Sequence, residues 1–249
     1  MTSWIGRALR RGILSSRYPA VPATPDEVPG TGRPPVVPRG TARSGGARAA
    51  CPVDAIGDST VDQGRCIRCA RCLAEGFAFD GDLEASVRRR VDLEWSDGQL
   101  HPMPGVDAPL AALGRSLHVF LIDVGSCTAC NREVLALANP YYDASRLGIF
   151  FTNSPRHADV LLVVGALTRE MTPALRRTYD ALPGPKSVVA VGACPISGGA
   201  FRGHPGVEAT IDRVVPVDVY VPGCPPTPLA VLDGLLRLAG RSRRVPETP

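Results

Sequence analysis

Residues 117–130 read LHVFLIDVGSCTAC. The first eight residues form a mostly apolar, β-branched run, which is typical of a strand buried on both faces of a parallel sheet. The run leads directly into Gly125 and two cysteines, Cys127 and Cys130. In open α/β sheets, ligands bind at the carboxyl ends of the strands. This stretch therefore predicts both the fold of the C-terminal half and the edge of the sheet where its chemistry lies.

Three later runs repeat this strand pattern. They are ADVLLVVGAL at 158–167, KSVVAVGAC at 186–194 and VPVDVYVPGC at 215–224. Segments with helical spacing alternate with them: REVLALAN at 132–139, TPALRRTYDAL at 172–182 and PLAVLDGLLRLAGR at 228–241. Strands that alternate with helices predict a parallel sheet with right-handed crossovers. We therefore expect an α/β, flavodoxin-like domain with an open parallel sheet over residues 116–249.

The chain has eight cysteines, and they divide into two sets of four. The first quartet is Cys51, Cys66, Cys69 and Cys72; the second quartet is Cys127, Cys130, Cys194 and Cys224. Members of the second quartet follow different predicted strands, so the sheet would bring them together at one edge. Four thiolates are what a [4Fe–4S] cluster requires. We therefore predict two [4Fe–4S] clusters, with all eight cysteines as iron ligands.

The spacing of the first quartet matches half of a known repeat. Bacterial two-cluster ferredoxins repeat C-x2-C-x2-C-x3-C-P, and each Cys-Pro ligates the cluster of the other repeat. On that template Thr41, Ser44, Ala47 and Gly76 stand where the other four cysteines would be. The remaining four form a complete set for one cluster. The alternative is a zinc site of four thiolates, but the tight C-x2-C-x2-C run favours iron–sulfur.

Composition excludes several other classes of protein. The net charge is only +4, and neither interleaved aromatic residues nor a nucleic-acid-binding motif is present. The most apolar stretch, residues 160–167, is much shorter than the roughly 20 residues of a spanning helix. Arg10 and Arg11 suggest a twin-arginine signal, but the residues after them lack the apolar region of such a signal. We expect no export, and a reducing cytoplasm in which the thiols remain available for metal.

The N-terminal third has a different character. Residues 2–17 place Trp4, Ile5 and Leu9 on one face of a predicted amphipathic helix, with arginines beside it. Such a helix suits a membrane surface or a partner's groove, or it docks on its own protein as an ordinary surface helix. The division predicted from the sequence is a helix and extended strap at 1–48, a ferredoxin-like α+β module at 49–80, a connector at 81–115 and the sheet domain at 116–249.

Three ligand segments carry a family resemblance. CTACNRE, GACPISGG and VPGCPPTP resemble the small-subunit family shared by complex I, as its 20-kDa subunit, and membrane-bound [NiFe] hydrogenases. The C-x2-C spacing of Cys127 and Cys130 resembles the hydrogenase side, including formate hydrogenlyase, because complex I proteins have adjacent cysteines there. Residues 1–80, with Tyr18-Pro19 before the cysteines, resemble the ferredoxin-like subunit of the same complexes (complex I 23-kDa or formate hydrogenlyase type). The chain thus resembles a fusion of two neighbouring subunits.

The resemblance implies an oxidoreductase subunit that is not catalytic alone. It would relay electrons through two clusters to or from a catalytic large subunit, in a membrane-associated complex of the group 4 [NiFe] hydrogenase or formate hydrogenlyase type. Its expected partners are that large subunit, membrane-embedded subunits and a donor such as ferredoxin or formate dehydrogenase, on the cytoplasmic inner face of the membrane. Two alternatives remain. One is a complex I-like NADH or ferredoxin:quinone oxidoreductase subunit, and the other is a non-catalytic cluster-binding assembly or sensor protein.

Several residues other than cysteine are candidates for supporting roles. The resemblance places Glu133 at the position of an acidic residue, either near proton traffic at the large-subunit interface or as an acid in the first turn of a helix. Gly125, Gly192 and Gly223 precede ligand cysteines, and we expect them to let backbone amides approach the cluster sulfurs. We expect none of the following histidines to be a ligand: His118, His157 and His204.

Overall fold

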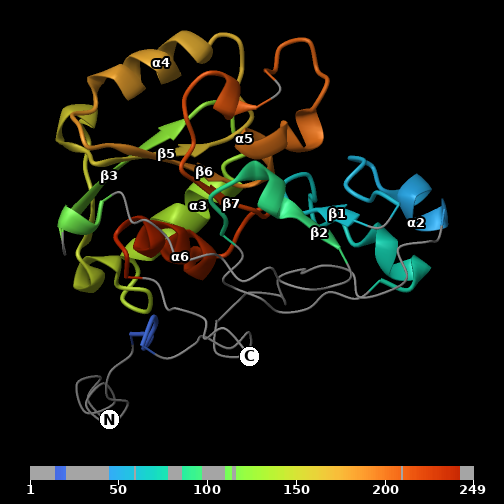
Figure 1. Ribbon diagram of the computed structural model, residues 1–249, viewed down its shortest axis with the longest axis horizontal. Helices are drawn as coiled ribbons and strands as arrows, with labels where there is room; N and C mark the ends of the chain where they lie inside the picture. The colour runs from blue at the N-terminus through green and yellow to red at the C-terminus, as the bar shows by residue number, and fades with distance from the viewer. Residues whose placement is uncertain are drawn as a thin grey trace, which may run out of the picture.

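The computed structural model describes residues 15–20, 45–58, 60–77, 86–96, 110–113, 116–208 and 210–241. Figure 1 shows a layered α/β domain and, beside it, a smaller region that contains α2, β1 and β2. Among the described helices, none combines the length and the apolar character needed to cross a bilayer.

The larger domain is built on a five-stranded sheet. Its strands are β3 (Leu117–Asp123), β4 (Ile149–Phe151), β5 (Val160–Val164), β6 (Ser187–Val191) and β7 (Val219–Val221). All four neighbouring pairs are parallel, and the spatial order is β4-β3-β5-β6-β7. Counted from the first strand of the sheet, this is the 2-1-3-4-5 order of flavodoxin-like folds. The predicted fold class of this half is confirmed.

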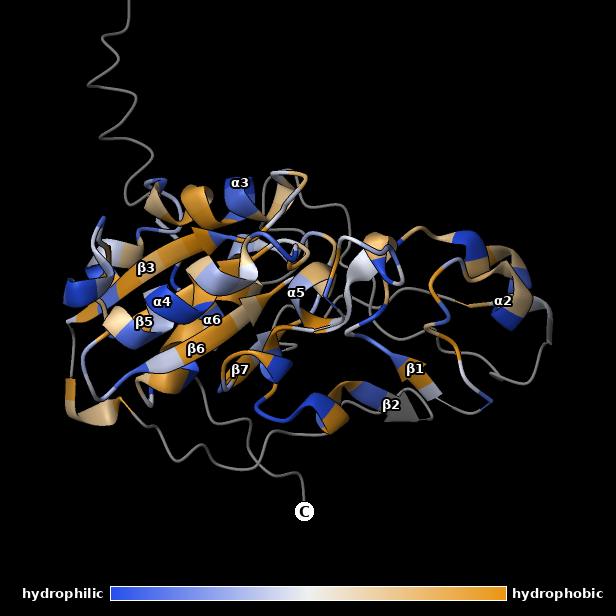
Figure 2. Ribbon diagram, turned by 90° about the horizontal axis from the view of Figure 1, so that it is seen from above, coloured by the Kyte–Doolittle hydropathy of each residue, from blue (hydrophilic) through white to orange (hydrophobic). Residues whose placement is uncertain are grey.

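Helices cover both faces of the sheet. They are α3 (Ala129–Leu135), α4 (Thr172–Ala181), α5 (Ala193–Ser197) and α6 (Pro228–Leu238). In Figure 1, α4 lies on one side of the sheet and α3 and α6 lie on the other. Figure 2 shows that the strands between them are coloured as hydrophobic along most of their length. Residues of β5 and β6 are buried at every position, as expected of strands covered on both faces.

Local chemistry explains where individual elements begin. Thr227 caps α6, because its side-chain oxygen accepts a hydrogen bond from the Ala230 N–H at 3.2 Å and Pro228 occupies the first turn. The Asp159 carboxylate accepts a hydrogen bond from the His118 N–H at 2.8 Å, at the start of β3. The Asp218 carboxylate does the same for the Val188 N–H at 2.8 Å, at the start of β6. These contacts fix the register of strands whose residues are otherwise alike.

The smaller region is an α+β arrangement. It contains α2 (Gly45–Ala50), β1 (Thr60–Asp62) and β2 (Glu94–Ser96), and β1 pairs antiparallel with β2. Residues 86–96 thus belong to this region, although the sequence suggested a connector from residue 81. They also reach the large sheet, since Val87 and Tyr220 exchange two backbone hydrogen bonds of 2.9 and 2.7 Å at the edge of β7. This stretch is a structural bridge between the two regions.

Short 3-10 helices complete the described path. They are η2 (Arg71–Glu75), η3 (Arg90–Leu93), η4 (Ala111–Leu113), η5 (Ala136–Ala138), η6 (Ala144–Leu147), η7 (Pro155–His157), η8 (Gly199–Phe201) and η9 (Ile211–Arg213).

A buried carboxylate anchors two distant segments to α6. Asp233 is fully buried and pairs with Arg237 one turn later, at 2.7 Å. The Tyr18 hydroxyl donates to the Asp233 carboxylate at 3.1 Å, and the Ser86 hydroxyl donates to it as well. The described part of the strap therefore lies on the sheet domain. The predicted helix at 2–17 falls almost wholly outside the described residues, as does the strap after residue 20.

Candidate metal centres

The structure brings the second quartet together at the carboxyl edge of the sheet. Cys127 lies in the loop after β3, and Cys130 lies in α3. Cys194 lies in α5 directly after β6, and Cys224 lies between β7 and α6. Their thiols are close enough to interact electrostatically. The other three cysteines raise the pKa of Cys130, and Cys224 and Cys127 raise the pKa of Cys194. Cysteines separated by up to 97 residues (224 minus 127) therefore share one site.

A carboxylate organises the loop that carries Cys127. Asp123, at the end of β3, accepts hydrogen bonds from the Gly125 N–H at 2.9 Å, from the Ser126 N–H at 2.8 Å and from the Asn131 side chain at 2.6 Å. Burial alone would raise the pKa of Asp123, but these hydrogen bonds and one from the Ser126 hydroxyl outweigh it, so the pKa lies below its ordinary value. The ionised Asp123 holds both ends of the loop around Cys127.

Gly192 makes room for a cysteine sulfur. Its φ of +94° lies in a region that L side chains rarely adopt, and a Cβ placed there would lie 2.7 Å from the Cys130 Sγ. Its N–H donates to the Val221 carbonyl at 2.8 Å, and the Gly125 N–H donates to Asp123. The N–H groups of these two glycines therefore donate to oxygen atoms. Gly192 matters for the space it leaves instead.

Three cysteines of the second quartet are buried or partly buried, and Cys127 is exposed. Burial, with smaller contributions from Cys194, Cys224 and Cys127, raises the pKa of Cys130 to about 12. Burial likewise raises the pKa of Cys194 to about 11, with added contributions from Cys224 and Cys127. Burial and Cys127 raise the pKa of Cys224, while Arg68 lowers it. Four thiolates can share this site only with positive charge among them, which is what iron would bring.

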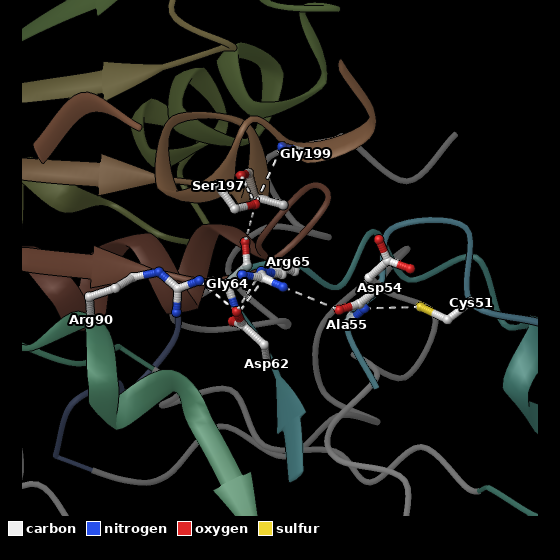
Figure 3. Close-up of polar contacts among 10 residues, drawn as sticks. Cys51, Asp54, Ala55, Asp62, Gly64, Arg65, Arg90, Ser197 and Gly199 are labelled. Carbon is white, nitrogen blue, oxygen red and sulfur yellow. Dashed lines mark hydrogen bonds and ion pairs between the residues drawn. The ribbon is translucent and has the colours of Figure 1, made fainter. Parts of the chain in front are cut away.

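The first quartet is gathered by a short segment. Cys51 follows α2, Cys66 and Cys69 lie in an irregular stretch, and Cys72 lies in η2. Burial, with smaller contributions from Cys72 and Cys51, raises the pKa of Cys66 to about 11, although the Arg68 amide opposes the rise. The Ala55 N–H donates to the Cys51 Sγ at 3.2 Å, as Figure 3 shows. This amide-to-sulfur hydrogen bond is of the kind that supports cluster ligands.

Two of the four template positions that lack cysteine are described. Ala47 is fully buried and packs with Ile56, Val61 and Phe77 in a small apolar cluster, against which Cys51 and Cys72 also pack. Gly76 is the left-handed residue that ends η2, with φ +82°. The other two positions, residues 41 and 44, lie outside the described residues.

A hydrogen bond and close packing connect the first quartet's segment to the sheet domain. Figure 3 shows the buried Ser197 of α5 beside the Gly64 carbonyl, at 2.9 Å. Asp62 accepts from the Gly64 N–H at 2.9 Å and pairs with Arg90 at 2.6 Å and with Arg65 at 3.1 Å. A Cβ on Gly64 would lie 2.7 Å from an Ile196 methyl group. The two regions are thus packed and hydrogen-bonded against each other along residues 60–65.

The sequence reasoning missed Arg68. It stands inside CIRCARC, between two first-quartet cysteines, yet its Nη1 donates to the Pro225 carbonyl at 3.4 Å. Pro225 directly follows Cys224 of the second quartet. The only signal in the sequence was a basic residue between two ligands, which does not by itself indicate a long-range contact.

Glu133 is half-buried in α3, where it acts electrostatically on Cys130 and on Tyr142. Burial raises the pKa of Glu133. It is not an acid of the first helical turn, because α3 begins at Ala129 and no acidic residue lies in its first turn. The alternative prediction, that Glu133 is an acid in the first turn of a helix and is stabilised by the helix dipole, was therefore wrong.

Two of the three histidines contact groups other than the cysteines. His118 is at the beginning of β3, and its Nδ1 lies 3.5 Å from the Asp159 carboxylate. The Nδ1 of His204 accepts a hydrogen bond from the Gly206 N–H at 3.1 Å.

Both quartets suit a [4Fe–4S] cluster in donor type and number. Each offers four thiols, and none of these cysteines forms a disulfide. Within the described ranges, no three Cys, His, Asp or Glu side chains gather closely enough for a single metal ion. That finding concerns single ions, whereas the irons of a cubane each take one thiolate and so require more widely spaced sulfurs. The space that Gly192 leaves beside Cys130 adds a structural feature consistent with a bulky group.

Comparison with known proteins assigns the sheet domain. The sequence model of the 20-kDa subunit of NADH ubiquinone oxidoreductase matches residues 127–238, which include the whole second quartet. A probable membrane-bound hydrogenase subunit, mbhJ of Pyrococcus furiosus, is 47% identical over 124 residues, covering 50% of this chain and 74% of that protein. An NADH-quinone oxidoreductase subunit of Desulfovibrio desulfuricans is 45% identical over 152 residues, covering 59% and 82%. Formate hydrogenlyase subunit 7 of Escherichia coli is 45% identical over 131 residues, covering 53% and 51%.

Proposed function

Because the chain belongs to the family of the 20-kDa subunit of NADH ubiquinone oxidoreductase, we propose that it is an electron-transfer subunit of a membrane-associated oxidoreductase complex. In this proposal it relays electrons between a donor and a catalytic large subunit through two [4Fe–4S] clusters, in a complex of the group 4 [NiFe] hydrogenase or formate hydrogenlyase type. Each electron accepted from the donor is delivered to the partner, so the chain itself is unchanged by a turnover.

One observation carries this proposal. Four cysteines from the segments that follow β3, β6 and β7 come together at the carboxyl edge of the sheet, inside the segment that the family model matches. A second group of four thiols lies in the adjacent region, and the two regions are in contact through Ser197 and Gly64. Two redox sites in neighbouring, packed regions are suited to pass electrons over a short distance.

The residues that would hold each cluster are the two quartets. When bound, a [4Fe–4S] cluster supplies a one-electron redox centre. The protein's own contribution is to keep water away from Cys130 and Cys194, to donate the Ala55 N–H to the Cys51 sulfur, and to leave space at Gly192. Hydrogen bonds to sulfur and exclusion of solvent are the means by which a protein sets a cluster's potential.

We further propose that α3 faces the large subunit. Leu135 is 67% exposed on this helix, and the half-buried Glu133 lies beside Cys130. The helix that carries ligand Cys130 and the partly buried Glu133 is, in this proposal, the surface that meets the subunit exchanging electrons with the cluster. Glu133, with its raised pKa, would be the protonatable group at that contact.

Residues 1–80 would come from a fused ferredoxin-like subunit that meets the donor, such as ferredoxin or formate dehydrogenase. The complex would sit on the cytoplasmic inner face of the membrane, against its membrane-embedded subunits.

Iron analysis of the full chain after anaerobic purification tests the proposal. We expect about eight iron atoms per chain and two reducible clusters by electron paramagnetic resonance, since two quartets bind four irons each. About four irons, or zinc in place of iron, would contradict the two-cluster reading. The assembly or sensor alternative would be favoured if the chain held its clusters but did not co-purify with a large subunit.

A second candidate function rests on the similarity to the NADH-quinone oxidoreductase subunit of Desulfovibrio desulfuricans. In that case the partner would pass electrons to a quinone. Sequencing the large subunit that co-purifies with the chain separates the two candidates. Two C-x2-C pairs for nickel and iron would favour the hydrogenase type, and their absence would favour quinone.

A further inference from the structure

Arg68 faces both cysteine quartets. It lies between Cys66 and Cys69 in the sequence, and its charge acts on Cys66 of the first quartet. The same charge acts on Cys224 and Cys130 of the second quartet. Its Nη1 donates to the Pro225 carbonyl at 3.4 Å, one residue beyond Cys224. One side chain from the first site thus reaches the ligand loop of the second.

The backbone conformation of Arg68 is unusual. Its φ is +57°, and that of Ala70, two residues later, is +64°. A left-handed conformation is unfavourable for a residue with a Cβ. Such outliers gather where the surrounding structure requires a particular direction of the chain. At Arg68 the conformation accompanies a side chain that leaves its own loop and contacts the neighbouring domain.

A partly buried guanidinium needs compensation. Removal from water disfavours a charged group unless partners of opposite charge or hydrogen-bond acceptors replace the water. Burial lowers the pKa of Arg68, whereas Cys66, Cys224 and Cys130 raise it, and the guanidinium stays protonated in any case. With clusters bound, the thiolates of both sites would be the negative groups nearest to it, and its hydrogen-bond acceptor is the Pro225 carbonyl.

A positive charge beside a redox site favours the form with one more electron. Two unit charges a few ångströms apart near a protein surface interact strongly enough to shift such an equilibrium measurably. Because Arg68 interacts with cysteines of both quartets, its positive charge would act on both clusters. We propose that Arg68 is a positioning residue common to the two sites, which ties the first quartet's loop to Pro225 and raises the reduction potential of both clusters. This inference rests on the proposed function, because it presumes that both quartets hold clusters.

Redox titration followed by electron paramagnetic resonance tests the inference on the full chain. Arg68→Met removes the charge and keeps an apolar stem of similar length, and Arg68→Lys keeps the charge. We expect the midpoint potentials of both clusters to fall in Arg68→Met. The expected fall corresponds to about a tenfold lower ratio of reduced to oxidised cluster at a given potential, which is 59 mV for a one-electron couple. Arg68→Lys should retain most of the potential.

Arg71 provides the matched control, since Arg71→Gln removes the same charge from the same motif at a solvent-exposed position. Water screens that charge, so its removal should change the ratio by less than about twofold. Equal shifts in Arg71→Gln and Arg68→Met would overturn the proposal, because they would show a general effect of net charge. Unchanged potentials in Arg68→Met with wild-type iron content would overturn it as well.

Iron content separates the remaining outcomes. If Arg68→Met loses iron and Arg68→Lys keeps it, the charge is needed at the shared position, which supports the proposal. If both variants lose iron, the requirement is for the shape of arginine, and the electrostatic role is refuted. Wild-type chain without clusters would refute the proposed function and this inference together. If the wild-type chain holds about eight irons and the midpoint potentials of Arg68→Met equal those of the wild type, the inference alone is refuted and the proposed function stands.

Discussion

The two cysteine quartets differ in how much of the chain is needed to build them. The first lies within residues 51–72, where one short segment winds through left-handed residues around its own cysteines. The second spans residues 127–224 and meets only because β3, β6 and β7 end at the same edge of a parallel sheet. The first site therefore depends on local conformation, and the second depends on the folding of the whole domain. Variants that affect one site and spare the other can measure this difference.

Loss of one ligand should give the largest effect. Cys69→Ser is expected to abolish the signal of the first site and leave that of the second, because Cys69 is an exposed residue of a local motif. Cys194→Ser should do the reverse, since Cys194 is packed in α5 at the end of β6. Iron content and electron paramagnetic resonance of the anaerobic protein measure both. If either substitution removes both signals, the two sites are not independent and the comparison fails.

The strands that build the second site were the most predictable part of the molecule. β3, β5, β6 and β7 are continuous apolar runs because both of their faces are covered by helices, and such runs stand out in a sequence. The edge strand β4 was missed: it has three residues, two of them phenylalanines about 40% exposed. The five-residue helix α5 was missed too, because it is too short for a periodic pattern and contains Pro195.

The bridge between the two regions was less predictable. β2 consists of Glu94, Trp95 and Ser96, which show no strand pattern on their own, and its partner β1 lies more than 30 residues earlier. Arg68 and Ser197 gain their roles from contacts between distant segments. Ligand motifs can be read from spacing, but contacts between separately folded segments depend on how those segments dock. The sequence therefore indicated both quartets and missed the residues that join them.

The second-largest effect is expected at Gly192. Gly192→Ala would place a methyl group 2.7 Å from the Cys130 Sγ in a backbone region essentially restricted to glycine. We expect the free energy of unfolding to fall by roughly 2–4 kcal/mol, through strain and overpacking, and the second site to lose iron while the first keeps it. Anaerobic denaturant titration and iron analysis measure the two effects.

Gly203→Ala is the control for backbone strain. Gly203 also has a positive φ, +82°, but a Cβ there would meet nothing within 4 Å. It should cost about 1 kcal/mol without loss of iron. If Gly203→Ala lowers the iron content as Gly192→Ala does, crowding of Cys130 is not the cause.

The smallest effect should come from the contact between the regions. Ser197→Ala removes the hydroxyl that lies 2.9 Å from the Gly64 carbonyl, together with its local contacts to the Ala193 carbonyl at 3.0 Å and the Gly199 N–H at 3.3 Å. Loss of one such hydrogen bond costs about 1 kcal/mol. Both sites should keep their iron, because no ligand moves. Hydrogen exchange should nevertheless quicken at residues 60–68 and stay unchanged in β5 and β6, since the lost contacts are the docking of Gly64 and local bonds next to α5. The exposed Ser145, whose hydroxyl donates to Asp143, is the control, and Ser145→Ala should alter neither region. Faster exchange throughout the sheet in Ser197→Ala would mean that the two regions unfold as one unit, and the distinction between a local and a domain-wide site would no longer hold.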